Sequence, residues 1–446
     1  MPPIPPIRQG SELPHTQQGI RRRNLSLVLR TVAAQGPLSR AAVASRIGLT
    51  RAAVSTLVDE LVRTDLLVEP GPGQRSTAVD RPGRPGRPGS ALALSERGPV
   101  GIGAEVGVDH LAACAVDLNG TVRAKAVLAG DNRGRPPEPV IKELTRLIRE
   151  VTEAARTAGL RPAGLGVAVP GLVGRDARTV VRAPNLGWTQ VDLGQHLGDA
   201  LPPYVDNEAN LGALAELWLG GSPTRPTPDS EPASESAAGG AIDAAADGTT
   251  DAAAGGDLAP RDFLHVSAEI GIGAAVVVDG RLLRGARGFA GELGHVPVRP
   301  EGPDCPCGGR GCLEQYAGAE AVLRAAGLPP GEGRVGQLAA LADGGDPRVR
   351  RALRGAGSAL GIAVSGAVNL LDPQTVVLGG ALSRLAPWLL PAMERELRRR
   401  TADPERPSGA SVSVSRLGSD GPLLGAAHAV VQAVLDDPAS APPPPA

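Results

Sequence analysis

One histidine and three of the chain's four cysteines lie within eighteen residues of one another, in a segment (291–314) that also holds six glycines and four acidic residues. A Zn²⁺ ion takes four nitrogen or sulfur ligands in a tetrahedron, and one imidazole with three thiolates fills that shell, which makes the site structural. Glycines let the backbone turn tightly enough for the sulfurs to converge. The predicted Zn²⁺ ligands are His295, Cys305, Cys307 and Cys312.

A disulfide loop is the alternative use of these cysteines. The opening residues MPPIPPIRQG lack the apolar segment of a signal peptide, and thiols stay reduced in the cytoplasm. We therefore expect a cytoplasmic protein and favour the metal site. No stretch of the sequence is long and apolar enough to span a bilayer, so no membrane contact is predicted. Cys114 lies apart in the apolar stretch LAACAVDL, where we expect it to fill the core.

The basic residues are concentrated at the start of the chain. Residues 1–100 hold fourteen Arg, no Lys and seven Asp plus Glu, whereas the net charge of all 446 residues is −1. A polyanion would therefore bind the N-terminal part. A chain of this length can form two or three domains, each with its own core.

The segment 40–60, RAAVASRIGLTRAAVSTLVDE, has the layout of a helix-turn-helix, with helices at about 39–47 and 50–64 and Gly48 at the turn. A helical hairpin inside a core would show the same pattern, but the Arg excess and the loop that follows favour DNA. The second of these helices would then enter the major groove. Residues expected near the base edges are Thr50, Arg51, Ala52, Ser55 and Thr56.

The loop at 69–90 contains RPGRPGRPG and precedes a strand-like stretch at 91–94. It resembles the wing of a winged helix, which would reach phosphates or the minor groove. A stiff Pro/Gly linker is an equally good interpretation. The wing residues would be Arg81, Arg84 and Arg87, in a winged helix-turn-helix domain that spans residues 20–95.

Two further regions, 98–220 and 261–435, begin with strand-like, Gly-punctuated sequence and then alternate with helical stretches, which indicates two α/β lobes. The tract between them, 222–258, is rich in Ser, Ala, Gly and Asp, and it cannot bury enough apolar surface to offset its ordering entropy. We predict that it is a disordered insertion. The Pro/Ala-rich tail after Asp437 is also expected to be loose.

Several segments resemble the ROK family of repressors, open reading frames and sugar kinases, although Ala268 replaces a larger aliphatic residue. The resemblance spans roughly residues 20–435 without the insertion. It implies an α/β, actin-like, two-lobed ATPase fold that follows the winged helix-turn-helix, with a sugar in the cleft. The segments are IGIGAAVVVDG (270–280), GARGFAGELGH (285–295), GVAVPGLV (166–173), APNLGW (183–188), VDNEANLGALAE (205–216) and NLLDPQTVVLGGAL (369–382).

The resemblance also implies a set of sugar-contacting residues. Carboxylates, amides and imidazole suit a ring of hydroxyls in a sheltered cleft. Any one of them alone would more often be a surface ion pair or a helix cap, but two of the glutamates flank the predicted metal ligands. His295 could bind the metal through one ring nitrogen and a hydroxyl through the other. The implied sugar-binding residues are Asn185, Asn207, Glu208, Glu292, His295 and Glu314.

The phosphate-binding positions of the family's kinases are altered in this chain. Their Asp-x-Gly-Gly-Thr loop corresponds to residues 105–109, EVGVD, so Asp109 would repel phosphates by about 1 to 4 kcal/mol at a separation of about 4 Å. Ile270, after Glu269, replaces a Thr of the second phosphate loop. Glu208 stands where the catalytic Asp is expected, and its extra methylene shifts the base by roughly an ångström. We therefore predict no catalytic residue and no enzyme activity.

A retained sugar pocket, an altered nucleotide site and a DNA-binding head together predict a sugar-responsive transcriptional repressor of carbohydrate-use genes. The pattern is similar to the xylose-repressor and N-acetylglucosamine-repressor branch of the family. The expected partners are operator DNA, a sugar effector and a second copy, because a homodimer or homotetramer places two recognition helices on half-sites about 34 Å apart. The alternatives are an ATP-dependent hexose kinase with an appended head, and a module that binds RNA or an acidic protein.

Overall fold

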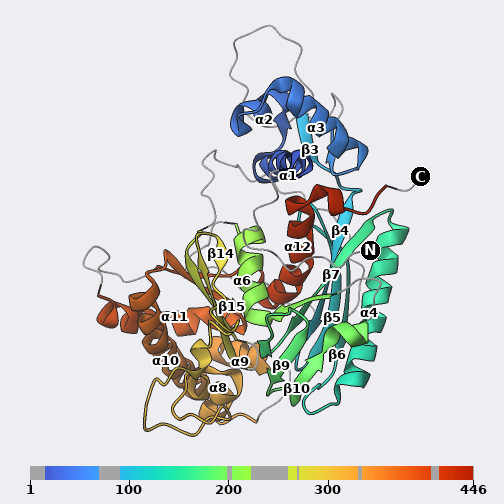
Figure 1. Ribbon diagram of the computed structural model, residues 1–446. Helices are drawn as coiled ribbons and strands as arrows, with labels where there is room; N and C mark the ends of the chain where they lie inside the picture. The colour runs from blue at the N-terminus through green and yellow to red at the C-terminus, as the bar shows by residue number, and fades with distance from the viewer. Residues whose placement is uncertain are drawn as a thin grey trace.

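The computed structural model describes residues 16–69, 91–197, 203–221, 260–268, 271–329, 334–402 and 411–444 (Figure 1). Three predicted features lie outside these residues: the insertion at 222–258, the wing arginines Arg81, Arg84 and Arg87, and the pair Glu269 and Ile270. Among the helices described, none has the length and apolar character needed to cross a membrane.

The N-terminal region, which we call the head, contains three helices and a three-stranded antiparallel sheet with β3 in its centre. Thr50 caps α3 by accepting a hydrogen bond from the backbone N–H of Ala53 (3.3 Å). Gly48 ends α2 in the left-handed conformation (φ 70°), which glycine adopts readily. The elements are α1 (Gln17–Gln35), β1 (Leu38–Ser39), α2 (Arg40–Ile47), α3 (Arg51–Arg63), β2 (Leu67–Val68) and β3 (Ala91–Leu94).

The first lobe is built on a five-stranded sheet of order β11-β7-β4-β5-β6. Its strands β4, β7 and β11 are parallel, so their carboxyl ends and the β4–β5 turn meet at one edge of the sheet. A small sheet of order β10-β9-β8 extends that edge. The elements are β4 (Pro99–Val106), β5 (His110–Asp117), β6 (Val122–Ala129), α4 (Pro137–Thr157), β7 (Arg161–Val169), β8 (Leu172–Val173), β9 (Thr179–Ala183), β10 (Trp188–Asp192), α5 (Leu193–Leu197), β11 (Pro203–Asn207) and α6 (Glu208–Leu219).

The second lobe repeats the strand arrangement of the first. Its sheet has the order β14-β13-β12-β15-β16, with three antiparallel strands followed by two parallel ones. Its helices pack around that sheet, and α10 and α11 lie against each other. The elements are β12 (Phe263–Ala268), β13 (Ile272–Val278), β14 (Arg281–Leu282), η1 (Leu293–His295), α7 (Glu314–Ala317), α8 (Ala319–Ala326), α9 (Arg334–Asp343), α10 (Pro347–Leu371), β15 (Thr375–Gly380), α11 (Ala381–Arg400), β16 (Ser411–Val414) and η2 (Gly418–Asp420).

The last long helix, α12 (Gly421–Asp436), packs on β4, β5 and β7 of the first lobe and along α6 (Figure 1). This packing corrects the division at 261–435, which assigned the helix to the second lobe. Glycines permit the close approach: a Cβ atom at Gly425 would lie 2.0 Å from the carbonyl oxygen of Leu211, and one at Gly101 would lie 2.0 Å from that of Ala427. A helix that is apolar on most of its faces is stable only when it is buried between other elements.

The chain after α12 continues into a short helix, η3 (Pro438–Ser440), with Pro438 buried. The tail was expected to be loose, and its first residues instead pack against the structure because α12 brings them to the base of the head. Both α12 and η3 lie against α1. Ser26 Oγ donates to the backbone carbonyl of Leu435 (2.7 Å), and Arg30 binds the carboxylate of Asp436 (2.6 Å).

The head therefore sits on the first lobe and on α12 rather than on a free linker. Apolar residues of α1 and α3 share one buried cluster with Val430 and Val434 of α12. From the first lobe, Arg161 donates to the carboxylate of Asp65 (2.9 Å) and to the backbone carbonyl of Thr64 (2.8 Å), at the end of α3. Any movement of α12 relative to the lobe would act on the head.

Candidate functional site

A cavity of about 220 Å³ lies between the two lobes and contains all six residues predicted to bind a sugar. The first lobe contributes one group of three and the second lobe another. Backbone segments with glycine line the remaining wall, including residues 271–274 and 288–291. The polar residues, in chain order, are Asn185, Asn207, Glu208, Glu292, His295 and Glu314.

The first-lobe half of the pocket is formed where β11 passes into α6. Asn207 caps α6, because its Oδ1 accepts a hydrogen bond from the backbone N–H of Ala209 (2.8 Å), and its Nδ2 donates to the carbonyl of Gly171 (2.7 Å). One amide hydrogen of Asn207 is left to donate to a ligand. Glu208 follows as the first residue of α6.

Glu208 has an ionisation close to neutral pH. Burial raises the pKa of its carboxyl to about 7, and the nearby charge of Glu105 adds to this effect, while His110 acts against it. A carboxyl that titrates near pH 7 can accept hydrogen bonds as a carboxylate or donate one as an acid. The protonation state of Glu208 at neutral pH is therefore sensitive to small changes in its surroundings.

The second-lobe half of the pocket is carried by η1 and by the start of α7. Glu292 precedes η1, and burial raises the pKa of its carboxyl. Glu314 Oε2 accepts a hydrogen bond from the backbone N–H of Ile272 (3.2 Å), which ties α7 to β13. The turn before Glu292 requires Gly291 (φ 103°), since a Cβ atom there would lie 2.1 Å from the carbonyl oxygen of Ala274.

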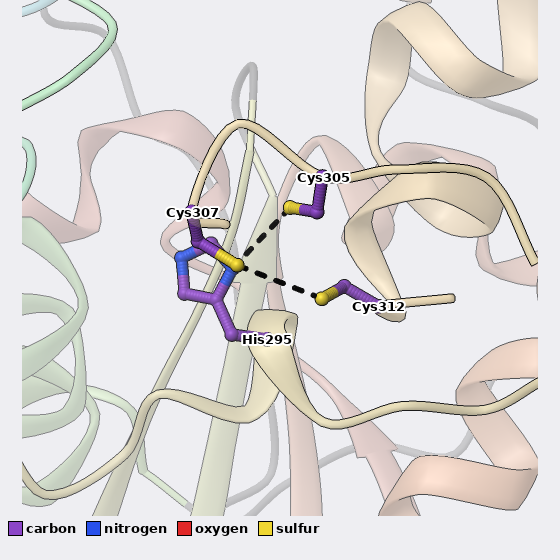
Figure 2. Close-up of side chains that lie close together, drawn as sticks. All are labelled: His295, Cys305, Cys307 and Cys312. Carbon is purple, nitrogen blue, oxygen red and sulfur yellow. Dashed lines mark hydrogen bonds between the residues drawn. The ribbon is translucent and has the colours of Figure 1, made fainter. Parts of the chain in front are cut away.

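The four predicted metal ligands converge directly behind this half of the pocket (Figure 2). Their ligand atoms all lie within 4.8 Å of one another. Cys305 Sγ is 3.8 Å from His295 Nδ1, and Cys307 Sγ is 3.7 Å from Cys312 Sγ, far beyond a disulfide bond of about 2.05 Å. All four cysteines of the chain are free, so the disulfide alternative is not observed.

The chemistry of this cluster suits a cation. The backbone N–H of Gly309 donates to Cys307 Sγ and lowers the pKa of that thiol. Burial, together with the neighbouring thiols, raises the pKa of Cys312 to about 12, so several thiolates cannot coexist here without a compensating positive charge. The set of one His and three Cys can therefore hold a metal ion.

The imidazole of His295 connects the cluster to the pocket. Its Nδ1 faces Cys305, and its Nε2 lies 3.8 Å from Glu292 Oε2. One ring nitrogen of His295 thus lies on the cysteine side and the other on the Glu292 side. Cys307 also lines the pocket, so the cysteine loop forms part of the pocket wall.

The β4–β5 turn contains an ion cluster that sequence reasoning missed. His110 Nδ1 is 2.8 Å from the carboxylate of Asp109, and its Nε2 is 3.7 Å from that of the buried Glu105. Burial disfavours the imidazolium, but the hydrogen bond to Asp109 and the negative charges of both carboxylates outweigh burial and raise the pKa of His110 to about 10. The ring lies against Gly107, where a Cβ atom would be 2.4 Å from it.

A second missed group is Asp206, a buried residue that borders the pocket and contacts Arg284 of the second lobe. The only sequence signal for Asp206 was its position directly before Asn207. Nothing in the sequence indicated that residue 284 would reach it, because the two are far apart in the chain.

The predicted DNA-contacting residues lie at the start of α3. Arg51, Ala52 and Thr56 are exposed, and Ser55 is half-buried. Thr50 is exposed and caps the helix, while Thr56 Oγ1 donates to the backbone carbonyl of Ala52 (3.2 Å). The first turn of α3 thus presents one guanidinium and short side chains to solvent.

Comparisons with known proteins place the chain among sugar regulators and sugar kinases. A family model described as "ROK family" matches residues 101–226 and 241–433, more than half of the chain. The xylose repressor of Bacillus subtilis (strain 168) is 28% identical over 422 residues, which cover 94% of this chain and 98% of the repressor. A glucokinase of Halalkalibacterium halodurans is 29% identical over 287 residues, 60% of this chain and 76% of that enzyme.

Solved structures agree on the fold. The crystal structure of a transcriptional regulator of the same family, a homologue of the E. coli MLC protein, has a TM-score of 0.70 at 24% identity and covers 94% of this chain and 97% of that one. The structure of a glucokinase from Streptomyces griseus in complex with glucose and AMPPNP has a TM-score of 0.59 at 24% identity. The match covers 75% of this chain and 99% of that one. The predicted α/β, actin-like, sugar-kinase-like fold is confirmed.

Proposed function

The chain belongs to the ROK family, and we propose that it is a sugar-responsive transcriptional repressor whose operator affinity changes when a sugar binds in the interlobe pocket. The observation that carries this proposal is the extent of similarity. The match to a xylose repressor covers 94% of the chain and so must include most of the head, whereas the match to a glucokinase covers 60%. We further propose that the controlled genes serve carbohydrate use.

The head would be a winged helix-turn-helix with α3 as its recognition helix. Two features support this: the first turn of α3 is exposed, and β2 and β3 are antiparallel neighbours, so the chain between them leaves and returns at one place. Operator half-sites would require a homodimer or homotetramer. Bases would be contacted by Thr50, Arg51, Ala52, Ser55 and Thr56, and phosphates or the minor groove by Arg81, Arg84 and Arg87.

The pocket would bind the sugar through hydroxyl groups on both lobes. Asn207 and Glu208 would hold one side of the ring, and Glu292 and His295 the other. A structural Zn²⁺ ion on His295 and the three cysteines would fix the position of the imidazole and of the loop that carries Cys307. A sugar that bridges the lobes favours a closed arrangement by the difference in its affinity for the open and closed states.

The β4–β5 turn supports a regulator over a kinase. The sequence had suggested that Asp109 presents a free carboxylate, but that group is paired with His110. The turn still carries two carboxylates for one imidazolium, and the ring of His110 occupies the space beside Gly107. A phosphate chain would meet net negative charge and a filled loop.

A contact path joins the pocket to the head. Helix α6 begins at Glu208 in the pocket and packs along α12, and α12 shares its apolar cluster with α1. A displacement of α6 on sugar binding would therefore reach the head through two helices. This path supports a change in the relative placement of two heads in a dimer.

The DNA part of the proposal is tested by in vitro selection from random duplex DNA with the full-length protein, followed by gel shifts on the enriched site. We expect sequence-selective binding, a loss of about 1 to 3 kcal/mol in Arg51→Ala, and unchanged sugar binding in that variant. Enrichment of no sequence, or equal binding to random RNA, would instead support a nonspecific or RNA-binding module.

The sugar part is tested by isothermal titration with a panel of pentoses, hexoses and N-acetylhexosamines that includes D-xylose and D-glucose. Glu292→Gln should abolish binding of the sugar found while it leaves DNA binding intact. The same panel with labelled ATP tests the hexose kinase alternative. Steady formation of a sugar phosphate would contradict the assignment as a regulator.

A further inference from the structure

One buried carboxylate of the pocket wall has no capacity left for a ligand. Asp206 is 2% exposed. Its Oδ1 accepts hydrogen bonds from Asn207 N and Asn210 Nδ2, both at 2.8 Å, and its Oδ2 accepts from Tyr204 Oη (2.7 Å) and Arg284 Nη2 (2.6 Å). A carboxylate has about four acceptor positions, so all of them are occupied. Asp206 therefore borders the cavity but has no free acceptor position for a ligand hydroxyl.

The bonds of Asp206 instead fix the first-lobe half of the pocket. They hold the backbone of Asn207 and the side chain of Asn210, and so the start of α6, where Glu208 lies. Tyr204 and Asp206 both belong to β11 of the first lobe. Three of the four donors therefore come from the first lobe itself.

The fourth donor, Arg284, comes from the second lobe. It follows β14 and precedes the loop that leads to Glu292. Its side chain reaches Asp206 and also Tyr204 Oη (2.5 Å), while its backbone carbonyl accepts a hydrogen bond from Ala290 N (3.2 Å) within that loop. One residue thus binds both halves of the pocket.

The Arg284–Asp206 pair has a buried carboxylate, unlike the ion pair between Arg133 and Glu320, which also joins the two lobes. The side chain of Asp206 is 3% exposed and that of Arg284 is 34% exposed. Arg133 of the first lobe and Glu320 of α8 are 3.9 Å apart with side chains 35% and 52% exposed. Exposed pairs contribute about 0 to 1 kcal/mol, whereas breaking a buried pair leaves an uncompensated charge.

We propose that Arg284 is a positioning residue that sets the register between the two halves of the sugar pocket. This inference rests on the proposed sugar function and deepens it: the ligand would be a polyhydroxylated ring held from both lobes, with hydroxyls spaced to match the separation that Arg284 fixes. Arg284 touches no ligand itself. Its contribution is to hold Asn207 and Glu208 opposite Glu292 and His295 before the ligand arrives.

The first test needs no ligand. Hydrogen exchange by mass spectrometry on the full chain should show at least tenfold faster exchange at 206–210 and at 285–292 in Arg284→Met, and no change in either segment in the matched Arg133→Met. Faster exchange at 285–292 alone would mean that Arg284 stabilises only its own loop, and the inference would be wrong.

A double variant guards against misfolding. Arg284→Met with Asp206→Asn leaves no unpaired buried charge, so it should fold as well as the parent and still show faster exchange in both segments. If the double variant exchanges like the parent, Arg284 does not position the pocket.

The second test uses D-xylose and D-glucose as probes. For whichever sugar binds the parent, Arg284→Met should raise the Kd at least tenfold, and Arg284→Lys should recover part of that loss, with DNA affinity unchanged in both. An unchanged Kd would overturn the inference. If the parent binds neither these sugars nor any of the panel, the proposed function fails, while the exchange experiment still decides the role of Arg284.

Discussion

Carboxylates with little access to solvent, the half-buried Glu208 and the buried Glu105, occur in two neighbouring places at the carboxyl edge of the first-lobe sheet, and the two places differ in what faces them. In the pocket, Glu208 faces the cavity, and burial raises the pKa of its carboxyl to about 7. In the β4–β5 turn, Glu105 faces the imidazole of His110, which also binds Asp109. A carboxylate with an internal cation is a structural element, whereas one without it remains available to a ligand.

The two places also differ in the space beside them. The pocket keeps polar groups around a cavity, with the cysteine cluster next to it. The β4–β5 turn holds an internal ion pair, and the ring of His110 lies against Gly107. The proposed regulator needs a ligand pocket but no phosphate-binding loop, because a ligand that shifts a conformational equilibrium need not react.

The largest expected effect concerns the support of the pocket. Cys312→Ser should reduce bound zinc from about one equivalent to well under half and lower the free energy of unfolding by about 4 kcal/mol or more, because the loop behind His295 loses a ligand. Sugar affinity should fall as well. Metal analysis measures the bound zinc, and chemical denaturation measures the free energy of unfolding. Cys114→Ala, in the core away from the cluster, should keep its zinc; equal zinc loss in both variants would contradict a local site.

An intermediate effect should follow from removal of the internal cation. His110→Ala should destabilise the protein by about 2 to 4 kcal/mol, since Glu105 would be left buried without its partner. Sugar affinity should change little. The exposed His196 on α5 provides the control, His196→Ala, which should be neutral. Strong ATP binding in His110→Ala would show that the imidazole alone had blocked a working nucleotide site.

The same ion cluster predicts how stability depends on pH. The pKa of His110 is about 10 in the folded chain and about 6.5 when unfolded, so its stabilisation is complete below pH 6.5 and is lost as the pH rises towards 10. The difference in unfolding free energy between the parent and His110→Ala should therefore shrink from pH 6.5 to pH 9.5. Urea denaturation at the two pH values measures it, and a constant difference would contradict the pairing.

The smallest expected effect distinguishes the pocket carboxylate. With a pKa of about 7, Glu208 is mostly protonated at pH 6 and mostly ionised at pH 8. Because a carboxylate accepts hydrogen bonds from sugar hydroxyls more strongly than a carboxyl does, affinity should rise about tenfold over this range. Glu208→Gln should bind with little dependence on pH. Titration calorimetry provides the measurement, and the same slope in the Gln variant would assign the dependence to another group.

Short-range spacing allowed the cysteine cluster and the α2–α3 turn to be predicted, whereas the six pocket residues were predicted from the family resemblance. Cys305, Cys307 and Cys312 must lie near one another because few residues separate them. Gly48 marked a helix end because only glycine adopts the required φ easily. The family resemblance added Asn207 and Glu208, which lie on the first lobe, across the pocket from Glu292 and His295. These features depend on local geometry or on a known pattern.

Contacts between distant segments could not be predicted. The sequence placed α12 in the second lobe, yet glycines on β4, β7 and α12 itself seat it on the first. Even the ion pairs of His110 with nearby Glu105 and Asp109 were not foreseen, because they depend on the β4–β5 turn and on burial of Glu105. Nor did the sequence indicate that Arg284 would reach Asp206.

The sequence by itself thus determined which chemical groups this protein possesses and which of them lie together through short spacing: one His and three Cys that could hold a metal ion, a helix-turn-helix pattern and a set of polar residues that match the family's sugar-contacting positions. The tertiary structure alone decided which carboxylates are neutralised and which face a cavity. The reason is physical: ionisation and ligand access depend on burial and on charges a few ångströms away, and those neighbours come from segments that only folding brings together.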